Sequence, residues 1–247
     1  QDITTRSRSQ VEIDLRGEEG QASALALIAR ADLLIEGFRP GVMERLGLGP
    51  EPCLARNPRL VYGRMTGWGQ HGPLAHAAGH DINYIAISGA LHAIGRAGEA
   101  PVPPLNYVGD FGGGGMLLAV GLLAALHEAG RSGRGQVIDL PLLDPLFSIL
   151  GPHAAAYRLT GKIKPRTGSR STNSAPRNAF KCSDGRYVGL SASTEKMARR
   201  LFEAIGRPEL ADDPRYATNA ARVQNADTLE PIIAAFILVQ AMHVSGA

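Results

Sequence analysis

The sequence predicts an α/β fold in which a large domain built on a parallel sheet is followed by the start of a smaller α+β domain. Apolar runs of strand length alternate with helix-patterned segments in the first part of the 247-residue chain, as in a parallel sheet covered by helices. A polar, basic stretch then interrupts this alternation. We therefore expect the large domain at residues 1–160, a linker at 161–179 and a partial small domain at 180–247.

The N-terminal part of the chain predicts a β-α-β unit. Val11–Leu15 alternates apolar and polar residues like a strand, Gly20–Arg30 has helical periodicity, and Ala31–Phe38 is a buried strand. We expect the two strands of this unit to be parallel and the connection through the helix to be right-handed, as such connections almost always are. A short helix at Gly41–Leu46 and a strand at Leu60–Met65 follow.

The later elements are separated by segments that are rich in glycine, proline and charge. The chain is extended at Pro101–Pro104, and no periodicity assigns Tyr84–Leu91 to a helix or a strand. Further along we expect an apolar helix at Met116–Glu128, a strand at Gln136–Leu140, a linker at Lys162–Asn178, a strand at Arg186–Ser191 and helices at Glu195–Ile205 and Thr228–Val239.

Composition excludes several classes of protein. Hydrophobic residues make up 44% of the chain, which is enough for a sizeable core and excludes global disorder. The 26 basic and 23 acidic residues leave a net charge of +3 without a basic cluster, so we expect no nucleic acid as a partner. Only four of the basic residues are lysines, and this excess of arginine is either a bias of composition or a sign of anion binding. No run of 18 apolar residues is present, so we expect no membrane partner.

The two cysteines give no sign of a disulfide framework or a metal site. Cys53 and Cys182 lie far apart and match no metal-ligand spacing. Free thiols are typical of a reducing compartment, so we expect a cytoplasmic location and no metal.

A glycine-rich string precedes the expected apolar helix. Gly109-Asp110-Phe111 runs directly into four glycines, Gly112–Gly115. An aspartate here is an ordinary helix N-cap, but four glycines are entropically costly and a cap does not need them. Because the N–H groups at a helix start favour negative charge, the string also fits an active-site loop against which a large ligand lies.

A second string, Gly79–Tyr84, places His80 next to Asp81. Neighbouring side chains of a strand point apart, so the two residues do not form an ordinary catalytic dyad. Taken alone, His80 is a surface histidine and Asp81 a possible helix cap.

Charged residues also follow the expected strands, where a parallel sheet forms its ligand crevice. Arg39 follows the strand Ala31–Phe38, Arg45 lies about a turn later, and Ile13–Arg16 ends the first strand. Each arginine is either a phosphate contact or a solvated charge. The motifs of P-loop, α/β-hydrolase, zincin and thioredoxin sites are absent from the sequence.

Together these strings resemble the family III CoA-transferase superfamily (CaiB/BaiF type), with the α-methylacyl-CoA racemases as the most similar branch. The motifs are Ala31–Gly41, Met65–Gln70, Gly79–Tyr84 and Pro103–Gly114, and they occur in the order of the family. The resemblance implies a Rossmann-like large domain. Members of the family usually begin with a further βα unit and return to the large domain at the C-terminus, so the resemblance also implies that the domain is incomplete and the chain a fragment.

In racemases of this kind, a histidine and the aspartate of the glycine-rich loop flank the α-carbon of a 2-methylacyl-CoA thioester. The resemblance assigns these two catalytic roles to His80 and Asp110. CoA is part of the substrate, so no separate cofactor is expected. By resemblance, the residues that contact CoA or substrate are Ile13, Asp14, Leu15, Arg16, Gly37, Phe38, Arg39, Arg45, Gly79, Asp81, Ile82, Asn83 and Tyr84.

The later part of the chain is more similar to the transferase branch. Asn173–Asn178 and Gly189–Thr194 carry this similarity. Racemases have a glutamate that supports the histidine, and an ungapped comparison puts Thr194 there, with Glu195 one residue later as a weaker catalytic candidate. In the transferases, the aspartate that matches Asp110 is a nucleophile that forms an anhydride and then an aspartyl-CoA thioester.

Three functions therefore stay open. The first is racemisation of 2-methylacyl-CoA, the second is CoA transfer between carboxylic acids, and the third is an inactive fragment that binds CoA or only dimerises. By resemblance we also expect an interlocked homodimer, since the polar linker is long enough to reach a partner chain.

Overall fold

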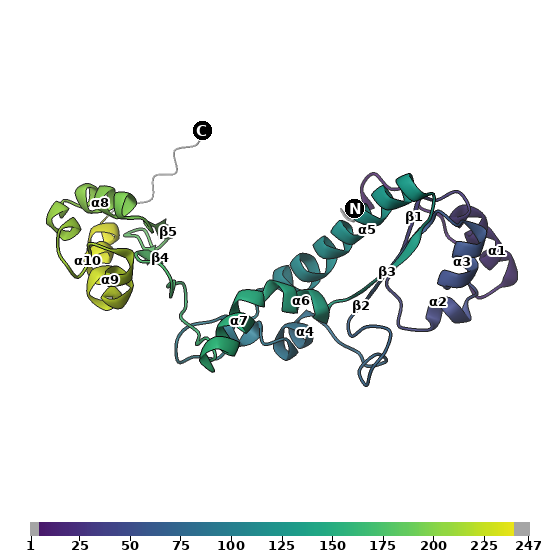
Figure 1. Ribbon diagram of the computed structural model, residues 1–247, viewed down its shortest axis with the longest axis horizontal. Coiled ribbons are helices and arrows are strands. Elements are labelled where there is room, and N and C mark those ends of the chain that lie inside the picture. Colours follow the sequence, from purple (N-terminus) through teal and green to yellow (C-terminus); the bar gives the residue numbers. More distant parts are fainter. Residues whose placement is uncertain (1–4, 240–247) are drawn as a thin grey trace. The chain divides into compact units, whose positions relative to one another are not determined.

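The computed structural model describes residues 5–239, and the chain divides into two compact units (Figure 1). The first unit comprises residues 1–92 and 103–164. The second comprises residues 93–102 and 165–247. The short segment 93–102 therefore belongs with the C-terminal part of the chain, although it interrupts the first unit in sequence.

A three-stranded parallel sheet forms the centre of the first unit. Its strands are β1 (Leu33–Glu36), β2 (Val61–Thr66) and β3 (Gln136–Pro141), with β2 in the middle. In the register, Val61 lies opposite Leu33 on one side and Gln136 on the other. The predicted α/β class with a parallel sheet is confirmed.

Helices account for most of the remaining first unit. Their bounds are α1 (Glu18–Ile28), α2 (Val42–Arg45), α3 (Pro50–Arg56), α4 (Asp81–Ile87), α5 (Met116–Ser132), α6 (Leu143–Ile149) and α7 (Gly151–Thr160), with a 3-10 turn at Leu91–Ala93 and a π-helix at Tyr107–Gly115.

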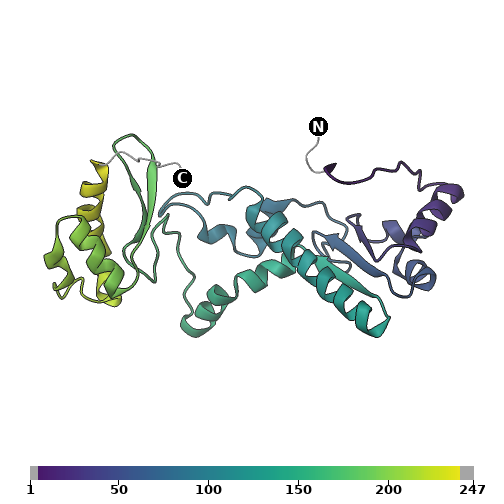
Figure 2. The same cartoon turned by 90° about the horizontal axis from the view of Figure 1, so that it is seen from above.

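The two faces of the sheet are covered by different helices. Side chains of successive strand residues point to opposite faces, so Tyr62 and Val61 of β2 enter different cores. Tyr62 packs with Ile28 and other residues of the α1–α3 layer, whereas Val61 packs with Leu122 and other residues of α5. Figures 1 and 2 show α5 running beside the sheet. β2 is buried along almost its whole length, as expected for a central strand that is covered on both faces, whereas Ile35 of β1 and Val137 of β3 are exposed.

The strand expected at Val11–Leu15 is wrong. The segment is irregular, ends in a turn at Leu15 and pairs with neither described sheet, and most of its side chains are exposed. Asp14 instead accepts hydrogen bonds from the backbone and guanidinium of Arg16. An alternating pattern gives a strand only where a neighbouring strand takes up its backbone groups, and here the parallel pairing begins with β1.

Of the two interpretations of the glycine-rich string, the one that makes Asp110 a helix N-cap is wrong. Asp110 lies inside the π-helix, which continues directly into α5. The N–H of Phe111 donates to Asn106 and that of Met116 to Phe111, so the turn uses these backbone groups internally. The helix start therefore lies earlier in the chain than the glycine run indicated.

The π-helix and α5 form one helical stretch, Tyr107–Ser132, that by length and composition alone is long and apolar enough to cross a membrane. In the structure, Leu118, Leu122, Ala125 and Ala129 bury one side of α5 against the sheet. Its apolar character therefore has a packing explanation on that side.

The second unit contains a two-stranded antiparallel sheet and a group of helices. Its elements are β4 (Arg177–Lys181), β5 (Tyr187–Ser191), α8 (Glu195–Ala204), a 3-10 turn at Pro208–Ala211, α9 (Asn219–Gln224) and α10 (Ala226–Leu238). Phe180, Phe202, Leu229 and Ile233 form its core. β4 begins inside the segment that the sequence assigns to the linker, and Arg170 before it pairs with Glu230 of α10 at 2.7 Å.

Candidate active site

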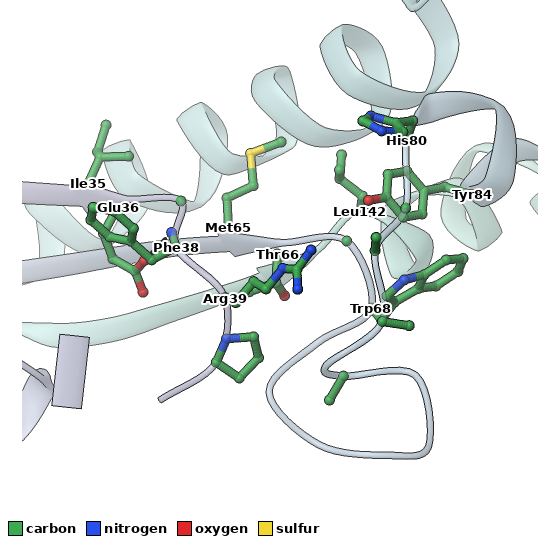
Figure 3. A pocket seen from close by; sticks show the side chains of 17 residues that line it. Ile35, Glu36, Phe38, Arg39, Met65, Thr66, Trp68, His80, Tyr84 and Leu142 are labelled. Carbon is green, nitrogen blue, oxygen red and sulfur yellow. Dashed lines mark hydrogen bonds between the residues drawn. The ribbon is translucent and has the colours of Figure 1, made fainter. Parts of the chain in front are cut away.

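A cavity of about 530 Å³ lies at the carboxyl ends of β1 and β2 (Figure 3). This is the edge of a parallel sheet at which ligands ordinarily bind. Its walls come from the loop after β1, the loop after β2 and the start of α4. The lining residues are Ile35, Glu36, Gly37, Phe38, Arg39, Pro40, Met65, Thr66, Gly67, Trp68, Ala75, Ala77, Ala78, Gly79, His80, Tyr84 and Leu142.

The loop after β1 is held by a buried ion pair. Arg64 of β2 contacts Glu36 at 3.1 Å and Glu44 at 2.9 Å. The other carboxylate oxygen of Glu36 accepts the N–H of Phe38 at 2.7 Å. Burial raises the pKa of Glu36, and the Phe38 N–H and Arg64 oppose this effect. The pair thus fixes the turn that carries Arg39, whose exposed guanidinium lies in the middle of the view in Figure 3.

An aromatic pair forms another wall. The rings of Trp68 and Tyr84 meet edge to face, with their centroids 4.7 Å apart. Burial raises the pKa of the Tyr84 hydroxyl, and the charge of Asp110 adds to this effect. Tyr84 is therefore a protonated hydroxyl at neutral pH. The indole N–H of Trp68 is buried without a hydrogen-bond acceptor among the described residues.

His80 stands at the start of α4 and lines the cavity. Its backbone is extended, as at a helix N-cap, and its N–H donates to the side-chain oxygen of Asn83 at 3.0 Å. The His80 side chain is exposed, and Figure 3 shows it near Tyr84. The string Gly79–Tyr84 therefore forms a helix start that presents an imidazole to the cavity.

Asp110 lies close to this helix start. Burial and the charge of Asp81 raise the pKa of Asp110, while a hydrogen bond with Asn106 and the interaction with His80 lower it. Because Asp110 interacts electrostatically with His80, Asp81 and Tyr84, the structure brings the two glycine-marked strings together. Asp110 is not itself among the residues that line the cavity.

The glycine run has a packing role that the sequence did not indicate. A Cβ on Gly114 would collide with the side chains of Leu142 and Met65. Gly114 therefore lets the π-helix approach Met65 of β2 and Leu142 at the start of α6. Gly115 is exposed, and the expectation that a ligand lies against the glycine run stays a prediction.

Six of the residues expected at the substrate line the cavity together: Gly37, Phe38, Arg39, Gly79, His80 and Tyr84. Ile82 and Asn83 are exposed on α4 outside the lining, and Arg45 is exposed at the end of α2. Asp81 turns into the protein, where its carboxylate contacts Asp110.

The segment Ile13–Arg16 is not part of this cavity. Ile13 and Asp14 line a different hollow of about 810 Å³ beside α1, and Leu15 packs against the α1–α3 core. Arg16 is exposed and paired with Asp14 at 2.8 Å. The four residues therefore do not come together with His80 and Asp110.

Glu195 belongs to the second unit. It is the first residue of α8, and its carboxylate accepts the N–H of Asn219 at 3.2 Å. Backbone hydrogen bonds, at the start of its own helix and from Asn219, lower the pKa of Glu195. Thr194, the residue before it, is the N-cap and accepts the N–H of Met197.

The sequence reasoning missed the wall that follows β2. Thr66 and Trp68 line the cavity, as does Leu142 after β3. The rule that ligands meet strand ends, which was applied to β1, would have found Thr66 and Trp68 had it also been applied to the strand Leu60–Met65. Within residues 5–239, no group of three or more His, Cys, Asp or Glu side chains is arranged to hold a metal ion.

Comparison with known proteins identifies the family to which the sequence is similar. The sequence pattern of CoA-transferase family III matches residues 2–243. The succinyl-CoA–L-malate CoA-transferase alpha subunit of Chloroflexus aurantiacus is 40% identical over 228 residues, which are 92% of this chain and 53% of that protein. The α-methylacyl-CoA racemase of Mus musculus is 40% identical over 208 residues, which are 83% of this chain and 54% of that protein.

Solved structures agree with the fold. The crystal structure of a CAIB/BAIF family protein from Brucella suis superposes with a TM-score of 0.79 at 31% identity, covering 95% of this chain and 61% of that one. The chain spans about half the length of the curated relatives that it matches.

Proposed function

The chain belongs to CoA-transferase family III, and on that premise we propose that it racemises 2-methylacyl-CoA thioesters by proton transfer at the α-carbon. The observation that carries the proposal is the pairing of His80 with Asp110. The two residues are 30 positions apart in sequence, yet Asp81, which directly follows His80, accepts the N–H of Asp110 at 2.7 Å, and His80 lines the cavity. A racemase needs two such groups, one for each face of the α-carbon.

The environments of the two groups suit this chemistry. Imidazole exchanges protons near neutral pH. A carboxyl group ordinarily loses its proton well below neutrality, but burial and the neighbouring Asp81 move the pKa of Asp110 upward. The direction of this shift favours a carboxyl group that takes part in proton transfer.

In the proposed reaction, one of the two groups takes the α-proton and the C–H electron pair moves into the thioester to form an enolate. The other group, already protonated, gives its proton to the opposite face of the α-carbon. The product thioester has the inverted configuration, and the two side chains have exchanged protonation states. The net reaction consumes no other reagent.

The enolate oxygen needs a hydrogen-bond donor. The hydroxyl of Tyr84 suits this role, because it lines the cavity and stays protonated at neutral pH. Arg39 is the cation that we assign to a CoA phosphate, since it is exposed at the cavity wall and a guanidinium binds phosphate by two parallel hydrogen bonds. Free, buried Cys53 and Cys182 support the cytoplasmic setting that we propose.

CoA transfer is the second candidate function. The transferase subunit from Chloroflexus aurantiacus matches 92% of this chain, against 83% for the mouse racemase, so the transferase similarity extends further along the sequence. In this scheme the Asp110 carboxylate attacks an acyl-CoA carbonyl and CoA leaves as thiolate. The thiolate then attacks the Asp110 carbonyl, which forms the aspartyl-CoA thioester and releases the first acid as its carboxylate. A second carboxylate runs the same two steps in reverse, leaves as the new CoA thioester and restores the Asp110 carboxylate.

One experiment separates the two reactions. The protein is incubated with a (2R)-2-methylacyl-CoA in deuterated water, and the α-carbon is examined for deuterium and for inversion. We expect both deuterium incorporation and inversion. The rate of each should fall on the order of 10²–10⁴-fold in His80→Ala and in Asp110→Asn. His153→Ala, which removes an exposed histidine of α7, is the control and keeps the unmutated rate.

The opposite outcome favours the transferase. If hydroxylamine traps an Asp110 adduct and no α-proton exchanges, the racemase proposal is wrong and CoA transfer replaces it. Should neither reaction occur in a folded sample that binds CoA, the chain is an inactive CoA-binding fragment.

A further inference from the structure

Asp81 has a contact that the resemblance did not indicate. It is the first residue of α4 and follows His80 directly, but its side chain is only 8% exposed and does not line the cavity. His80 and Asp81 therefore face different surroundings from one helix start, the imidazole toward the cavity and the carboxylate toward the interior.

The Asp81 carboxylate binds the backbone of the catalytic aspartate. Its Oδ2 atom accepts the N–H of Asp110 at 2.7 Å, across 29 positions of sequence. A Cβ on Gly109 would collide with the same carboxylate, so the absence of a side chain at position 109 gives Asp81 access to the next N–H. The contact joins the helix start that carries His80 to the π-helix that carries Asp110.

Only one of the two Asp81 carboxylate oxygens takes part in this hydrogen bond. Oδ1 of Asp81 is buried and has no hydrogen-bond partner among the described residues. A buried oxygen without a partner is costly, and an apolar or amide side chain would reduce that cost in a purely structural contact. A charged group therefore stands beside Asp110 at a site where stability alone does not favour it.

We propose that Asp81 is a positioning residue for Asp110: its buried carboxylate holds the Asp110 backbone at a fixed place relative to His80 and puts a negative charge next to the Asp110 carboxyl. The proposal rests on the proposed function, since it takes Asp110 as the reacting group. It also departs from the expectation that Asp81 contacts CoA.

The charge has a consequence for pH dependence. The titratable groups that interact with Asp110 are Asp81 and Tyr84 of α4 and His80, the N-cap of α4, and Asn106 hydrogen-bonds to it. Within the described residues, no charged group of α5 or α6 contributes to the Asp110 shift. Asp81 raises the pKa of Asp110, so removal of its charge moves that pKa down, and the acid limb of the activity profile moves to lower pH.

Two substitutions separate position from charge. Asp81→Asn keeps an oxygen that accepts the Asp110 N–H but removes the charge, so we expect a rate within about 10-fold of the unmutated protein and an acid limb at lower pH. Asp81→Ala removes both the accepting oxygen and the charge. We expect its rate to fall on the order of 10²-fold, because the reacting group is then misplaced. Asp144→Asn, an exposed aspartate in the first turn of α6, is the matched control and changes neither property.

A second measurement does not depend on activity. In NMR spectra of the full chain, the amide proton of Asp110 should resonate downfield, as expected for a bond to a carboxylate, and should resist exchange with solvent. We expect Asp81→Ala to move the signal upfield and speed the exchange, and Asp81→Asn to change the exchange much less.

The outcomes distinguish the two proposals. Loss of the Asp110 amide signature in Asp81→Ala supports the contact even if the protein neither exchanges α-protons nor transfers CoA, which would sink only the proposed function. An Asp81→Ala protein with an unchanged amide signal, or an active Asp81→Asn protein with an unmoved acid limb, overturns the positioning role. If Asp81→Ala does not fold, the acid limb of Asp81→Asn decides.

Discussion

At the scale of single residues, two carboxyl groups near the cavity are used in opposite ways. Glu36 is buried, but the guanidinium of Arg64 and the N–H of Phe38 occupy its two oxygens, so it is committed to holding the loop. Asp110 is less enclosed and lies beside a second acid, Asp81. The satisfied group stabilises the loop, and the group with an unfavourable neighbour is free to react.

The environment of Asp110 predicts a conflict between activity and stability. Its pKa in the folded protein is raised, so the folded state holds the proton more tightly than the unfolded chain does. The stability that this proton contributes is present below the unfolded pKa and is lost as pH rises through the folded pKa. Asp110→Asn should therefore raise the melting temperature at pH 7, by at most about 2–4 °C, while it lowers activity on the order of 10²–10⁴-fold.

Thermal unfolding of both proteins between pH 4 and pH 8 checks this prediction. The increase in melting temperature should become smaller toward pH 4, because more of the Asp110 carboxyl group of the unmutated protein is protonated there. A melting temperature that falls in the variant at pH 7 would contradict the prediction and show that the Asp110 carboxylate is a net structural contact.

Two of the candidate phosphate arginines, Arg39 and Arg45, should behave differently, because Arg39 lines the cavity and Arg45 does not. A charge-assisted hydrogen bond contributes about 1.5–3 kcal/mol, so Arg39→Gln should weaken CoA binding by about 10-fold or more. Arg45→Gln is the matched control, and its affinity for CoA should stay within about 2-fold of that of the unmutated protein. Calorimetry with CoA at low and high salt measures both variants, and equal losses would place CoA outside the cavity described here.

At the scale of elements, the sequence predicted those whose pattern is local. The strand Leu60–Met65 and the helix Glu195–Ile205 match β2 and α8 within a residue at each end, because their periodicity and their boundaries are visible in the segment itself. The helix expected at Gly20–Arg30 is likewise confirmed as α1.

The elements that the sequence did not predict correctly depend on contacts between distant segments. Val11–Leu15 has the alternation of a strand but no partner strand, and no local pattern reveals that absence. The π-helix around Asp110 depends on Gly114 packing against Leu142 and Met65, residues 28 and 49 positions away. His80 and Asp110 were found from the family resemblance, whereas their link through Asp81 required the fold.

The π-helix gives a prediction about packing. Gly114→Ala would push a methyl group into the side chains of Leu142 and Met65, so we expect overpacking to cost about 1–3 kcal/mol of unfolding free energy. Gly130→Ala, in α5 with open space around it, is the matched control and should stabilise by up to about 1 kcal/mol.

Chemical denaturation measures both effects. Since the methyl group at position 114 also displaces the turn that carries Asp110, activity should fall in Gly114→Ala even at temperatures at which the protein is folded. Equal stability of the two variants would show that the neighbouring side chains move aside without cost.

At the scale of the whole molecule, the division of the chain into units is not sequential. Residues 93–102 leave the first unit, join the second and return before Pro103. Gly168 donates its N–H to Gly95, and Arg166 donates to the carbonyl of Glu99, so this excursion is held by the segment that the sequence assigned to the linker. A composition rich in polar and basic residues indicated a flexible connection, and it could not indicate those long-range hydrogen bonds.

An exposed apolar face of the π-helix and α5 bears on the expected homodimer. One side of α5 packs on the sheet, but the other presents Met116, Val120 and Leu123, each more than half exposed, with Leu123 at 66%, and Phe111 of the π-helix is exposed before them. A face of this kind suits burial against another chain.

We therefore expect a homodimer in which this face is buried. Light scattering should give twice the 26.1 kDa mass of one chain, and Leu123→Glu should shift the protein toward the monomer, because it places a charge in the apolar face. Glu128→Gln, which changes a charge on a different side of the same helix, is the matched control and should leave the mass unchanged. A monomer in the unmutated protein would refute the dimer, and a Leu123→Glu protein that stays dimeric would show that the two chains meet through a surface other than α5.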